Sequence, residues 1–259
     1  MKRTVLITGA SGGIGLELAH IFASKGAKLV LVARSKDKLD TFKLKIGKKY
    51  GVTIYNIGKD LTNLDAAREV FDEISKKQIH IDFLINNAGF GDFGHFAKSS
   101  YEKQLQMINL NVTTLTLLTH LFLPDMIKAG YGKILNVAST AAFQPGPTMS
   151  VYFATKAYVL SFSEAIAHEL SKTGVTVTVL CPGATETGFK DAADLEQSQL
   201  FKNKNVATAK QVAEFGFKKM MKGDVVVIHG FKNKLMAKSA RLAPRKLVVA
   251  IAKMTLRKK

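Results

Sequence analysis

The side chains best suited to chemistry in this sequence lie between Ser139 and Lys156. Tyr152 and Lys156 are four residues apart, so on a helix the phenol and the ammonium would share one face, one turn apart. A free phenol has a pKa of about 10, and a neighbouring cation lowers that pKa by favouring the phenolate. Ser139 follows the apolar run 133–138, thirteen residues before Tyr152. The three side chains could form a proton-transfer group, although a Tyr and a Lys at this spacing also occur on solvated helix faces.

The N-terminus predicts a strand, a glycine turn and a helix. Residues 4–8 form a short β-branched run, Gly9, Gly13 and Gly15 follow it, and a helical pattern begins at Leu16. Glycines let a backbone approach a pyrophosphate, while the free N–H groups of a helix's first turn face the anion. The spacing is not the commoner Gly-x-Gly-x-x-Gly, and a glycine-rich turn can be a turn only. The position between strand and helix favours a phosphate cradle for a dinucleotide.

The second predicted strand, 28–33, ends where a dinucleotide fold reads the adenosine ribose. An NAD site places a carboxylate there, whereas a 2′-phosphate needs that carboxylate absent and a guanidinium nearby. Ala33 is followed here by Arg34 and Ser35. Asp37 is the nearest acid and suits the first turn of the next helix. We therefore predict NADP(H) in preference to NAD(H).

Strands and helices alternate along the chain. Further strands are expected at 52–57, 81–89, 133–138, 175–183 and 224–229, with helices at 63–77, 101–129 and 152–172. This alternation predicts an α/β fold with a Rossmann-type doubly wound parallel sheet, and 259 residues suit a single domain. We expect residues 1–230 to form the dinucleotide-binding and catalytic domain and residues 231–259 a basic helical C-terminal extension.

The positive charge is concentrated near the C-terminus. Residues 202–259 hold 16 Lys or Arg against two acids, a net charge of +14, whereas residues 1–201 hold 22 against 18, or +4. Pro244 is expected to separate two short helices, the second with Leu247, Ile251 and Met254 on one face. The tail could pack on the body or a second subunit, lie peripherally on an anionic membrane, or bind nucleic acid. Nucleic acid is the least favoured because Phe231 is the only aromatic residue after the last predicted strand.

The composition also limits the cellular setting. Cys181 is the only cysteine and cannot form an internal disulfide. The N-terminus carries no signal-peptide pattern, and no apolar run approaches the roughly 20 residues of a membrane span. These features predict a cytoplasmic protein, with peripheral membrane association as an option for the tail. The six histidines show no spacing typical of metal ligands, so no metal is predicted.

Residues 4 to about 230 resemble the short-chain dehydrogenase/reductase family. The matching motifs occur in the family's order, and they are Thr8-Gly-x-x-x-Gly-Ile-Gly15, Asn86-Asn-Ala-Gly89, Asn111, Ser139, Tyr152-x-x-x-Lys156 and Pro182-Gly183. Each motif alone is weak, but their joint occurrence in this order is specific.

The resemblance implies a role for each matching polar residue. Tyr152 would be the general acid that protonates a carbonyl oxygen, or the base in the reverse direction. Lys156 would lower the pKa of Tyr152 and hold the nicotinamide ribose, and Ser139 would donate a hydrogen bond to the carbonyl oxygen. Asn111 would hold a water that connects Lys156 to solvent. Asn109 competes for this role, but the family's interval from this Asn to a later proline favours Asn111.

The resemblance also implies how NADP(H) would be bound. Gly9 to Ile14 would hold the pyrophosphate, Asp60 and Leu61 would flank adenine, and residues 87–89 would lie along the centre of the cofactor. The loop after the strand 175–183 would meet the nicotinamide. The full expected set is Gly9, Ser11, Gly13, Ile14, Gly15, Arg34, Ser35, Asp60, Leu61, Asn87, Ala88, Gly89, Tyr152, Lys156, Pro182, Gly183, Thr185 and Thr187.

Three segments, 90–96, 141–151 and 184–205, are expected to wall the substrate site. Their large apolar side chains are Phe90, Phe93, Phe96, Phe143, Met149, Phe189 and Phe201. Such a lining favours a lipophilic or acyl-type carbonyl, although the same residues could simply pack the loops on the body.

These observations predict an oxidoreductase that transfers a hydride between NADP(H) and a carbonyl/alcohol pair, in the reducing direction, and that forms a homodimer or homotetramer. The alternative is a dinucleotide-sensing binding protein docked to a membrane or partner by its basic tail. Such a protein keeps the glycine turn and loses the catalytic groups. The presence of Asn111, Ser139, Tyr152 and Lys156 favours the enzyme.

Overall fold

The computed structural model describes residues 3–189, 193 and 206–256. Its centre is a parallel sheet with the strand order β3-β2-β1-β4-β5-β6-β9. The strands are β1 Thr4–Thr8, β2 Lys28–Ala33, β3 Ile54–Gly58, β4 Phe83–Asn86, β5 Gly132–Val137, β6 Val175–Cys181 and β9 Val226–Ile228. The strand order changes direction between β1 and β4. The connections that follow these two strands lead to opposite sides of the sheet and leave a crevice at the carboxyl ends of the strands.

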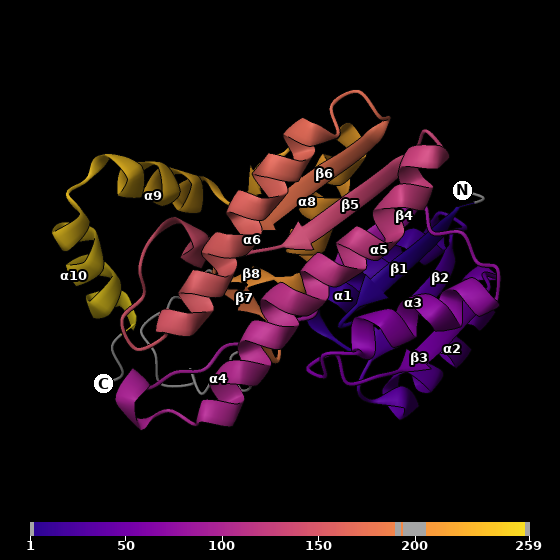
Figure 1. Ribbon diagram of the computed structural model, residues 1–259, viewed down its shortest axis with the longest axis horizontal. Helices are drawn as coiled ribbons and strands as arrows, with labels where there is room; N and C mark the ends of the chain where they lie inside the picture. Colours follow the sequence, from indigo (N-terminus) through magenta and orange to yellow (C-terminus); the bar gives the residue numbers. More distant parts are fainter. Residues whose placement is uncertain (1–2, 190–192, 194–205, 257–259) are drawn as a thin grey trace.

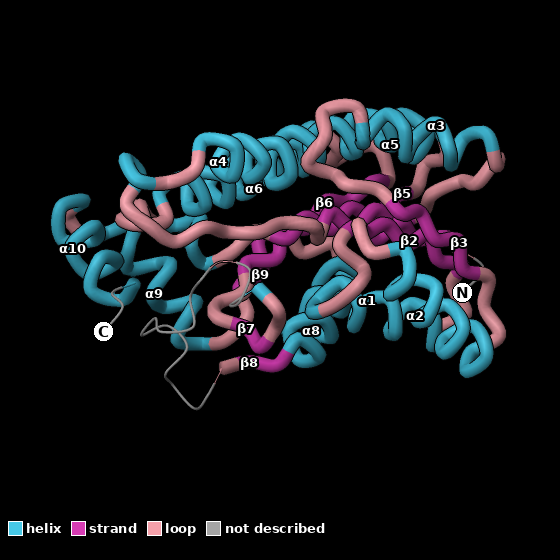
Figure 2. The backbone as a smooth tube through the Cα atoms, turned by 90° about the horizontal axis from the view of Figure 1, so that it is seen from below, coloured by secondary structure: helices cyan, strands magenta, loops and turns pink. Residues whose placement is uncertain are grey.

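Helices cover both faces of the sheet, as Figures 1 and 2 show. One layer contains α1 Gly13–Ser24, α2 Lys36–Tyr50 and α8 Ala209–Lys222, and the other contains α3 Ala66–Lys76, α5 Leu115–Lys128 and α6 Ser150–Glu169. Each layer buries its own apolar cluster against the sheet, with Phe22 and Leu31 in the first and Leu118 and Phe122 in the second. The predicted Rossmann-type α/β fold in one domain is confirmed.

Several predicted elements have different bounds in the structure. The strand expected at 81–89 is only Phe83–Asn86, because the following residues leave the sheet to form the site. Helix α8 was not predicted, although Thr208 and Gln211 form a capping box at its start, a signal that can be read from sequence. Just before it, β8 Ala207–Thr208 pairs with β7 Thr185–Glu186 in a small second sheet.

The single helix expected at 101–129 is interrupted. It consists of α4 Tyr101–Ile108, a π-helical turn Asn109–Thr114 and α5. A π turn accommodates one extra residue within a helix and often marks a functional site.

The composite helix Tyr101–Lys128 is long and apolar enough to cross a membrane, judged by length and composition only, and it is the one such helix in the described part of the chain. Leu118, Phe122 and Met126 on its buried face pack in the second apolar cluster against the sheet. The helix therefore packs as a core helix does.

The C-terminal tail forms the two predicted helices. They are α9 Phe231–Leu242 and α10 Arg245–Leu256, which meet at Pro244. Both project beyond the end of the sheet, and α10 turns back toward α4 and the lower end of α6 (Figure 1). In the last turn of α9, the Arg241 guanidinium lies 5.9 Å from the ring centre of Phe143.

Candidate active site

The carboxyl ends of β1 and β4 are joined by a hydrogen-bond network around Thr8. The Thr8 hydroxyl accepts from the N–H groups of Asn87 and Ala88, both at 3.0 Å, and lies 3.3 Å from the Ile85 carbonyl oxygen, to which it donates. The Asn87 amide donates to the carbonyl oxygens of Thr8 and Gly9. This network fixes the strand ends on both sides of the crevice.

The glycine turn packs backbone against backbone. Gly9 has a φ of +66° and Gly13 one of +54°, values that favour glycine. A Cβ atom at Gly15 would lie 2.5 Å from both the Gly9 carbonyl oxygen and the Asn87 side-chain nitrogen. Helix α1 begins at Gly13, so its free N–H groups point to the crevice. Thr187 approaches this turn, because a Cβ at Gly13 would lie 3.0 Å from its methyl group.

We expect Gly15→Ala to weaken NADPH binding by about tenfold or more, since a clash of this kind costs about 1–3 kcal/mol and is relieved by moving the turn. Gly12→Ala is the matched control, because Gly12 has an extended φ of −177° and a Cβ there would meet nothing within 4 Å. Calorimetric titration with NADPH measures the effect, and thermal unfolding without ligand shows whether the whole fold has suffered. Equal NADPH affinities for Gly15→Ala and Gly12→Ala would show that the glycine turn does not hold the cofactor.

The residues expected around the adenosine lie at the carboxyl ends of β2 and β3. Arg34 is exposed in the loop after β2, and Ser35 occupies the N-cap position of α2. Asp60 accepts from the N–H and hydroxyl of Thr62, and the Leu61 carbonyl accepts from the Thr114 hydroxyl at 2.7 Å. The structure thus brings these four residues to the same edge of the sheet as the glycine turn.

Ser139, Tyr152 and Lys156 meet at the ends of β5 and α6. Ser139 is the N-cap of a short 3-10 helix, Thr140–Phe143, and accepts from the Ala141 N–H. Tyr152 and Lys156 are both buried in α6, and the Ser139 hydroxyl is a hydrogen-bond partner of the Tyr152 phenol. The Lys156 ammonium donates to the Val137 carbonyl at 2.9 Å and lies 5.8 Å from the centre of the tyrosine ring.

Burial controls the proton affinities of this pair. It raises the pKa of Tyr152 to about 12, while the hydrogen bond from Ser139 acts in the opposite direction. It lowers the pKa of Lys156 to about 8, which the nearby Cys181 partly opposes. The loss of water around the phenol is the largest influence on the Tyr152 pKa, and the net shift is upward. The lowering by Lys156 that the resemblance implies stays a prediction.

Lys156 should give stability a defined pH dependence. Its pKa in the folded state is about 8, whereas an unfolded lysine titrates near 10.4, so the unfolded chain binds more protons between these values and stability rises with pH there. In wild type we expect the free energy of unfolding to rise by about 1 kcal/mol per pH unit in this range, and we expect this rise to be absent in Lys156→Met. Urea unfolding across this range measures it, with Lys128→Met, on the exposed end of α5, as the control. Parallel curves for wild type and Lys156→Met would contradict the expectation.

Asn111 lies in the π turn and is buried. Its side chain accepts from the Phe90 N–H and donates to the Phe90 carbonyl and the Thr155 hydroxyl. A Cβ atom at Gly89 would lie 2.9 Å from the Asn111 amide oxygen and 3.4 Å from the Lys156 nitrogen. Asn111 therefore lies beside Lys156 and the loop after β4, whereas Asn109 is half-buried.

The loop after β6 closes the other side of the site. The Pro182 carbonyl accepts from the Thr140 N–H at 2.8 Å, which ties this loop to the 3-10 helix that follows Ser139. The Thr185 hydroxyl donates to the Gly183 carbonyl, and the Thr187 hydroxyl accepts from the Phe189 N–H. Every expected cofactor position of the described chain thus lies along one edge of the sheet.

The predicted apolar wall forms only in part. Phe90, Phe93, Met149 and Phe189 gather around Tyr152, and the Phe189 ring centre lies 5.2 Å from that of the tyrosine. Phe143 instead packs with a different cluster, and Phe96 is 66% exposed, so the structure does not place these two in the wall. Phe201 lies outside the described residues.

Three residues of this wall were missed by the sequence reasoning. Met107, Phe153 and Leu256 are buried in the Tyr152 cluster. Phe153, next to the tyrosine, could have been inferred from its position. Leu256 could not, because it reaches the site only through the fold of the C-terminal tail.

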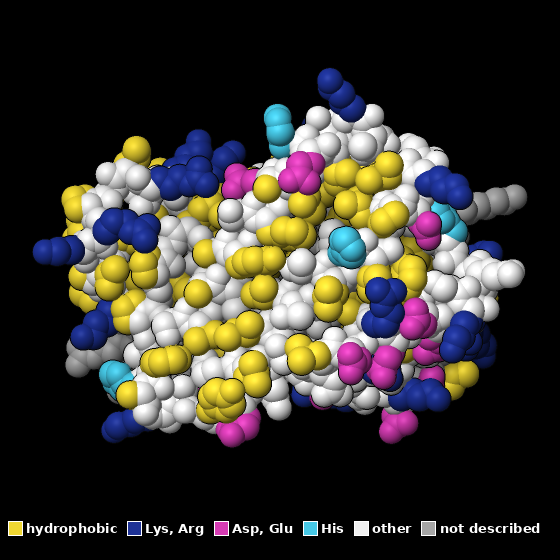
Figure 3. Space-filling view, in the orientation of Figure 1, with side chains coloured by type: hydrophobic (Ala, Val, Ile, Leu, Met, Phe, Trp, Pro, Cys, Tyr) yellow, Lys and Arg dark blue, Asp and Glu magenta, His cyan; other side chains and the backbone are white. Residues whose placement is uncertain are grey.

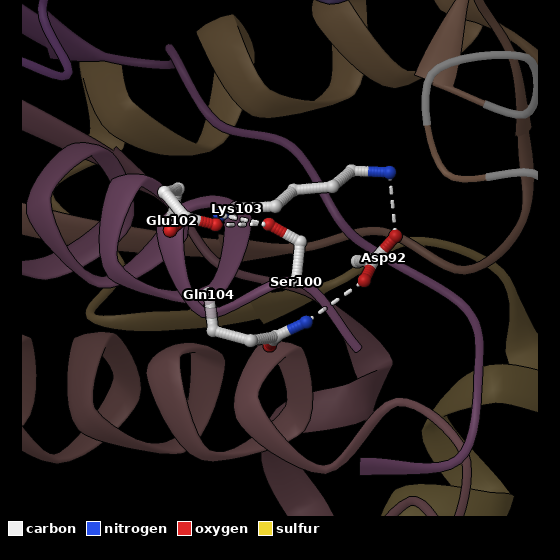
Figure 4. A network of polar contacts seen from close by, with 5 residues as sticks. All are labelled: Asp92, Ser100, Glu102, Lys103 and Gln104. Atoms are coloured by element: carbon white, nitrogen blue, oxygen red, sulfur yellow. Dashed lines mark hydrogen bonds and ion pairs between the residues drawn. The ribbon is translucent and has the colours of Figure 1, made fainter. Parts of the chain in front are cut away.

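A polar network anchors the loop that carries Phe90 and Phe93 (Figure 4). The largely buried Asp92 carboxylate forms an ion pair with Lys103 and accepts from the Gln104 amide at 2.8 Å. In the same turn of α4, Ser100 caps the helix by accepting from the Lys103 N–H. A second tie comes from the Gly94 N–H, which donates to the Thr148 carbonyl. The loop is thus fixed to both α4 and the loop before α6.

Two other kinds of chemistry find no support in the described residues. None of their His, Cys, Asp and Glu side chains form a group of three able to hold a metal ion. Cys181 is free and buried, and burial raises the pKa of its thiol to about 12, so it is not a reactive thiolate.

Comparisons with known proteins identify the family of this chain. The sequence model described as short chain dehydrogenase matches residues 3–198. A sulfoacetaldehyde reductase from Chromohalobacter salexigens is 34% identical over 223 residues, which cover 83% of this chain and 86% of the reductase.

Two solved structures have the same fold. A short-chain dehydrogenase from Sphingobium yanoikuyae in complex with NADPH has a TM-score of 0.83 and 33% identity, covering 93% of this chain and 94% of that one. A bulky-bulky ketone specific alcohol dehydrogenase from Comamonas testosteroni has a TM-score of 0.79 and 30% identity, covering 93% and 92%. The resemblance noted in the motifs is confirmed, and the chain belongs to the short-chain dehydrogenases, a family of oxidoreductases.

Proposed function

We propose that this protein is an NADP(H)-dependent oxidoreductase that reduces a lipophilic or acyl-type carbonyl to the alcohol. The observation that carries the proposal is the meeting of Ser139, Tyr152 and Lys156 beside a glycine cradle at one edge of the sheet. In this reaction the carbonyl gains a hydride at carbon and a proton at oxygen, and NADPH becomes NADP⁺.

The residues present fit such a cofactor. The close backbone packing at Gly9 and Gly15 and the start of α1 at Gly13 suit a pyrophosphate. Arg34, exposed at the end of β2, would pair with a 2′-phosphate, and no acid occupies residues 33–36 to repel it. When bound, NADPH supplies the hydride. The NADPH complex of the Sphingobium relative supports this assignment.

The protein's own side chains would supply the proton. Tyr152 is neutral at physiological pH because burial raises its pKa to about 12, so it can donate from its hydroxyl to a carbonyl oxygen. Ser139 would orient that oxygen and stabilise the phenolate left behind. The Lys156 ammonium would resupply the proton, and Asn111, which lies beside Lys156 at Gly89, would hold the path to solvent.

The substrate class follows from the wall around Tyr152. Phe90, Phe93, Met149 and Phe189 line it, and apolar walls favour apolar substituents on the carbonyl. The preference of the Comamonas relative for bulky-bulky ketones supports this class. The sulfoacetaldehyde reductase points instead to a small anionic aldehyde, which makes the two substrates a useful contrast.

The test is NADPH oxidation, followed at 340 nm, with aryl and long-chain ketones, 3-oxoacyl thioesters and sulfoacetaldehyde. We expect turnover of the bulky or acyl carbonyls and little of sulfoacetaldehyde. The reverse order of turnover rates would overturn the proposed substrate class but would still agree with a reductase. Absence of turnover across the whole panel would overturn the reductase and favour a dinucleotide-sensing binding protein.

Asp92→Ala should separate substrate positioning from chemistry. Without the ion pair to Lys103 and the hydrogen bond from Gln104, the loop 90–96 loses its attachment to α4. We expect KM to rise about fivefold, which corresponds to about 1 kcal/mol, with kcat nearly unchanged. Steady-state kinetics measure both constants, and Glu73→Ala, which removes the ion pair to Lys77 at the C-terminal end of α3, is the control. A fall in kcat with constant KM would show that Asp92 acts on the chemistry.

The remaining expectations complete the proposal. We propose that residues 1–230 carry cofactor binding and catalysis, that the protein works in the cytoplasm, and that it forms a homodimer or homotetramer. The single buried cysteine supports a reducing compartment. Light scattering of the purified protein tests the oligomeric state, and a monomer would contradict it.

A further inference from the structure

The C-terminal helices expose an unusual amount of apolar surface. Of the 19 large apolar side chains exposed in the described residues, seven lie in α9 and α10: Phe231, Leu235, Met236, Leu242, Leu247, Ile251 and Met254. Phe231 is 82% exposed and Leu242 89%. In Figure 3 apolar and basic side chains gather at the end of the molecule formed by these helices. A cluster of this kind marks a contact surface.

The exposed residues are ordered along the helices. In α9, Phe231, Leu235 and Leu242 recur at positions 0, 4 and 11 and so share one face. In α10, Leu247, Ile251 and Met254 recur at 0, 4 and 7 and face outward, as the sequence predicted for a stripe. Both helices are therefore amphipathic, and each turns an apolar stripe toward solvent.

The opposite faces attach the helices to the body. Val248, Ala252 and Leu256 of α10 are buried, and Leu256 joins the cluster around Tyr152. In α9, Ala237 is buried, and Asn233 packs closely on Gly183. The outward apolar stripes are thus held in a fixed position on the molecule.

Cations surround the stripes and acids are absent. The described part of the tail contains Lys232, Lys234, Lys238, Arg241, Arg245, Lys246 and Lys253, and the sequence contains no Asp or Glu after Asp224. In α9, Lys234 and Lys238 lie on one side of the line through Leu235 and Leu242, and Lys232 lies on the other. Long basic side chains can reach headgroups while the apolar residues between them enter the interface.

We propose that the outer face of α9 and α10 docks the protein on an anionic lipid bilayer. Charge complementarity identifies this partner, since Lys and Arg side chains near an anionic bilayer are attracted to its headgroups. The exposed Phe, Leu, Ile and Met side chains supply the apolar insertion that binding by charge alone would lack. The proposal is independent of the reaction assigned above.

Two other occupants fit the surface less well. A second copy on a two-fold axis would place this face against itself and so bring cations against cations. Nucleic acid would pair with the lysines but would leave the aliphatic stripes uncovered, and Phe231 is the only aromatic residue for base stacking.

Sedimentation of the full-length protein with vesicles of phosphatidylcholine, with and without phosphatidylglycerol, tests the proposal. We expect binding only to the anionic vesicles, weakened by salt. The double variant Leu242→Gln with Leu247→Gln should lower the affinity by about tenfold, and Lys238→Gln with Lys246→Gln by a similar factor.

Matched controls carry the same changes elsewhere. Leu44 and Leu64 are exposed apolar residues outside the tail, and Lys43 and Lys45 lie on the exposed part of α2; their Gln variants should bind as wild type does. The proposal fails if the protein does not bind anionic vesicles, or if tail and control variants lose binding equally. It also fails if the tail variants instead change the oligomeric mass in light scattering, or if they abolish binding to duplex DNA while vesicles stay unbound.

Discussion

Tyr152→Phe is expected to lower kcat by about a thousandfold, because a positioned general acid contributes roughly 10²–10⁴ to such a rate. The substitution removes one oxygen from a buried ring that packs against Phe153 and Phe189. The ring contacts remain, and Lys156 keeps its hydrogen bond to the Val137 carbonyl. NADPH affinity should therefore stay within a small factor of the wild-type value.

Tyr158→Phe is the matched control. Tyr158 lies on the same helix, and its hydroxyl pairs with Thr116 at 3.1 Å on the exposed side. We expect wild-type turnover for this variant. Stopped-flow measurement of NADPH oxidation gives the rate of the chemical step, and fluorescence titration gives the NADPH affinity. If Tyr152→Phe instead loses NADPH binding with its chemistry intact, the role assigned to the phenol is wrong.

Arg34→Glu should reverse the proposed preference for NADPH over NADH. The side chain follows β2 at the sheet edge that carries the glycine cradle and is exposed, so the new carboxylate can turn toward the same place. A carboxylate repels a 2′-phosphate and accepts from a 2′-hydroxyl. We expect the ratio of the dissociation constants for NADH and NADPH to fall by about a hundredfold, or about 2.7 kcal/mol.

Calorimetric titration with each dinucleotide measures that ratio without relying on turnover. Lys45→Glu changes the net charge equally from an exposed position on α2, so it controls for long-range electrostatics. Equal changes in both variants would mean that the overall field and not a local contact sets the preference. An unchanged ratio in Arg34→Glu would remove Arg34 from the cofactor site.

The parts of the site that could be predicted from sequence depend on short-range order. The glycine turn is recognisable because Gly9, Gly13 and Gly15 stand between a strand and a helix, and the backbone packs there as expected. Tyr152 and Lys156 share a helix face because four residues make about one turn. The alternation of strands and helices then determined which ends meet, so that Ser139 reaches Tyr152 from another element.

The parts that could not be predicted depend on the tertiary surroundings. The pKa of Tyr152 is set by burial, which no spacing reveals. The outward stripe of α10 was recognised, but the burial of Val248, Ala252 and Leu256 on its other side depends on where the tail turns. Phe143 and Phe96 lie in a predicted wall segment, yet loop geometry directs one to another cluster and the other to solvent.

The π turn at 109–114 lies between α4 and α5, whose inward-facing side chains must keep a fixed orientation relative to each other. Met107 before it and Leu118 and Phe122 after it all point inward, while Asn111 within it faces the loop that follows β4. Because a π turn accommodates one extra residue within a helix, deleting one residue in the turn would restore a continuous α-helix and keep the orientation of α4 relative to α5. The attachment of Asp92 to Gln104 would then survive, whereas the position of Asn111 would change. A deletion within α4 or α5 would instead rotate the residues on one side of it by about 100° relative to those on the other. Among single-residue deletions in this part of the chain, those in the turn should therefore cost the least stability.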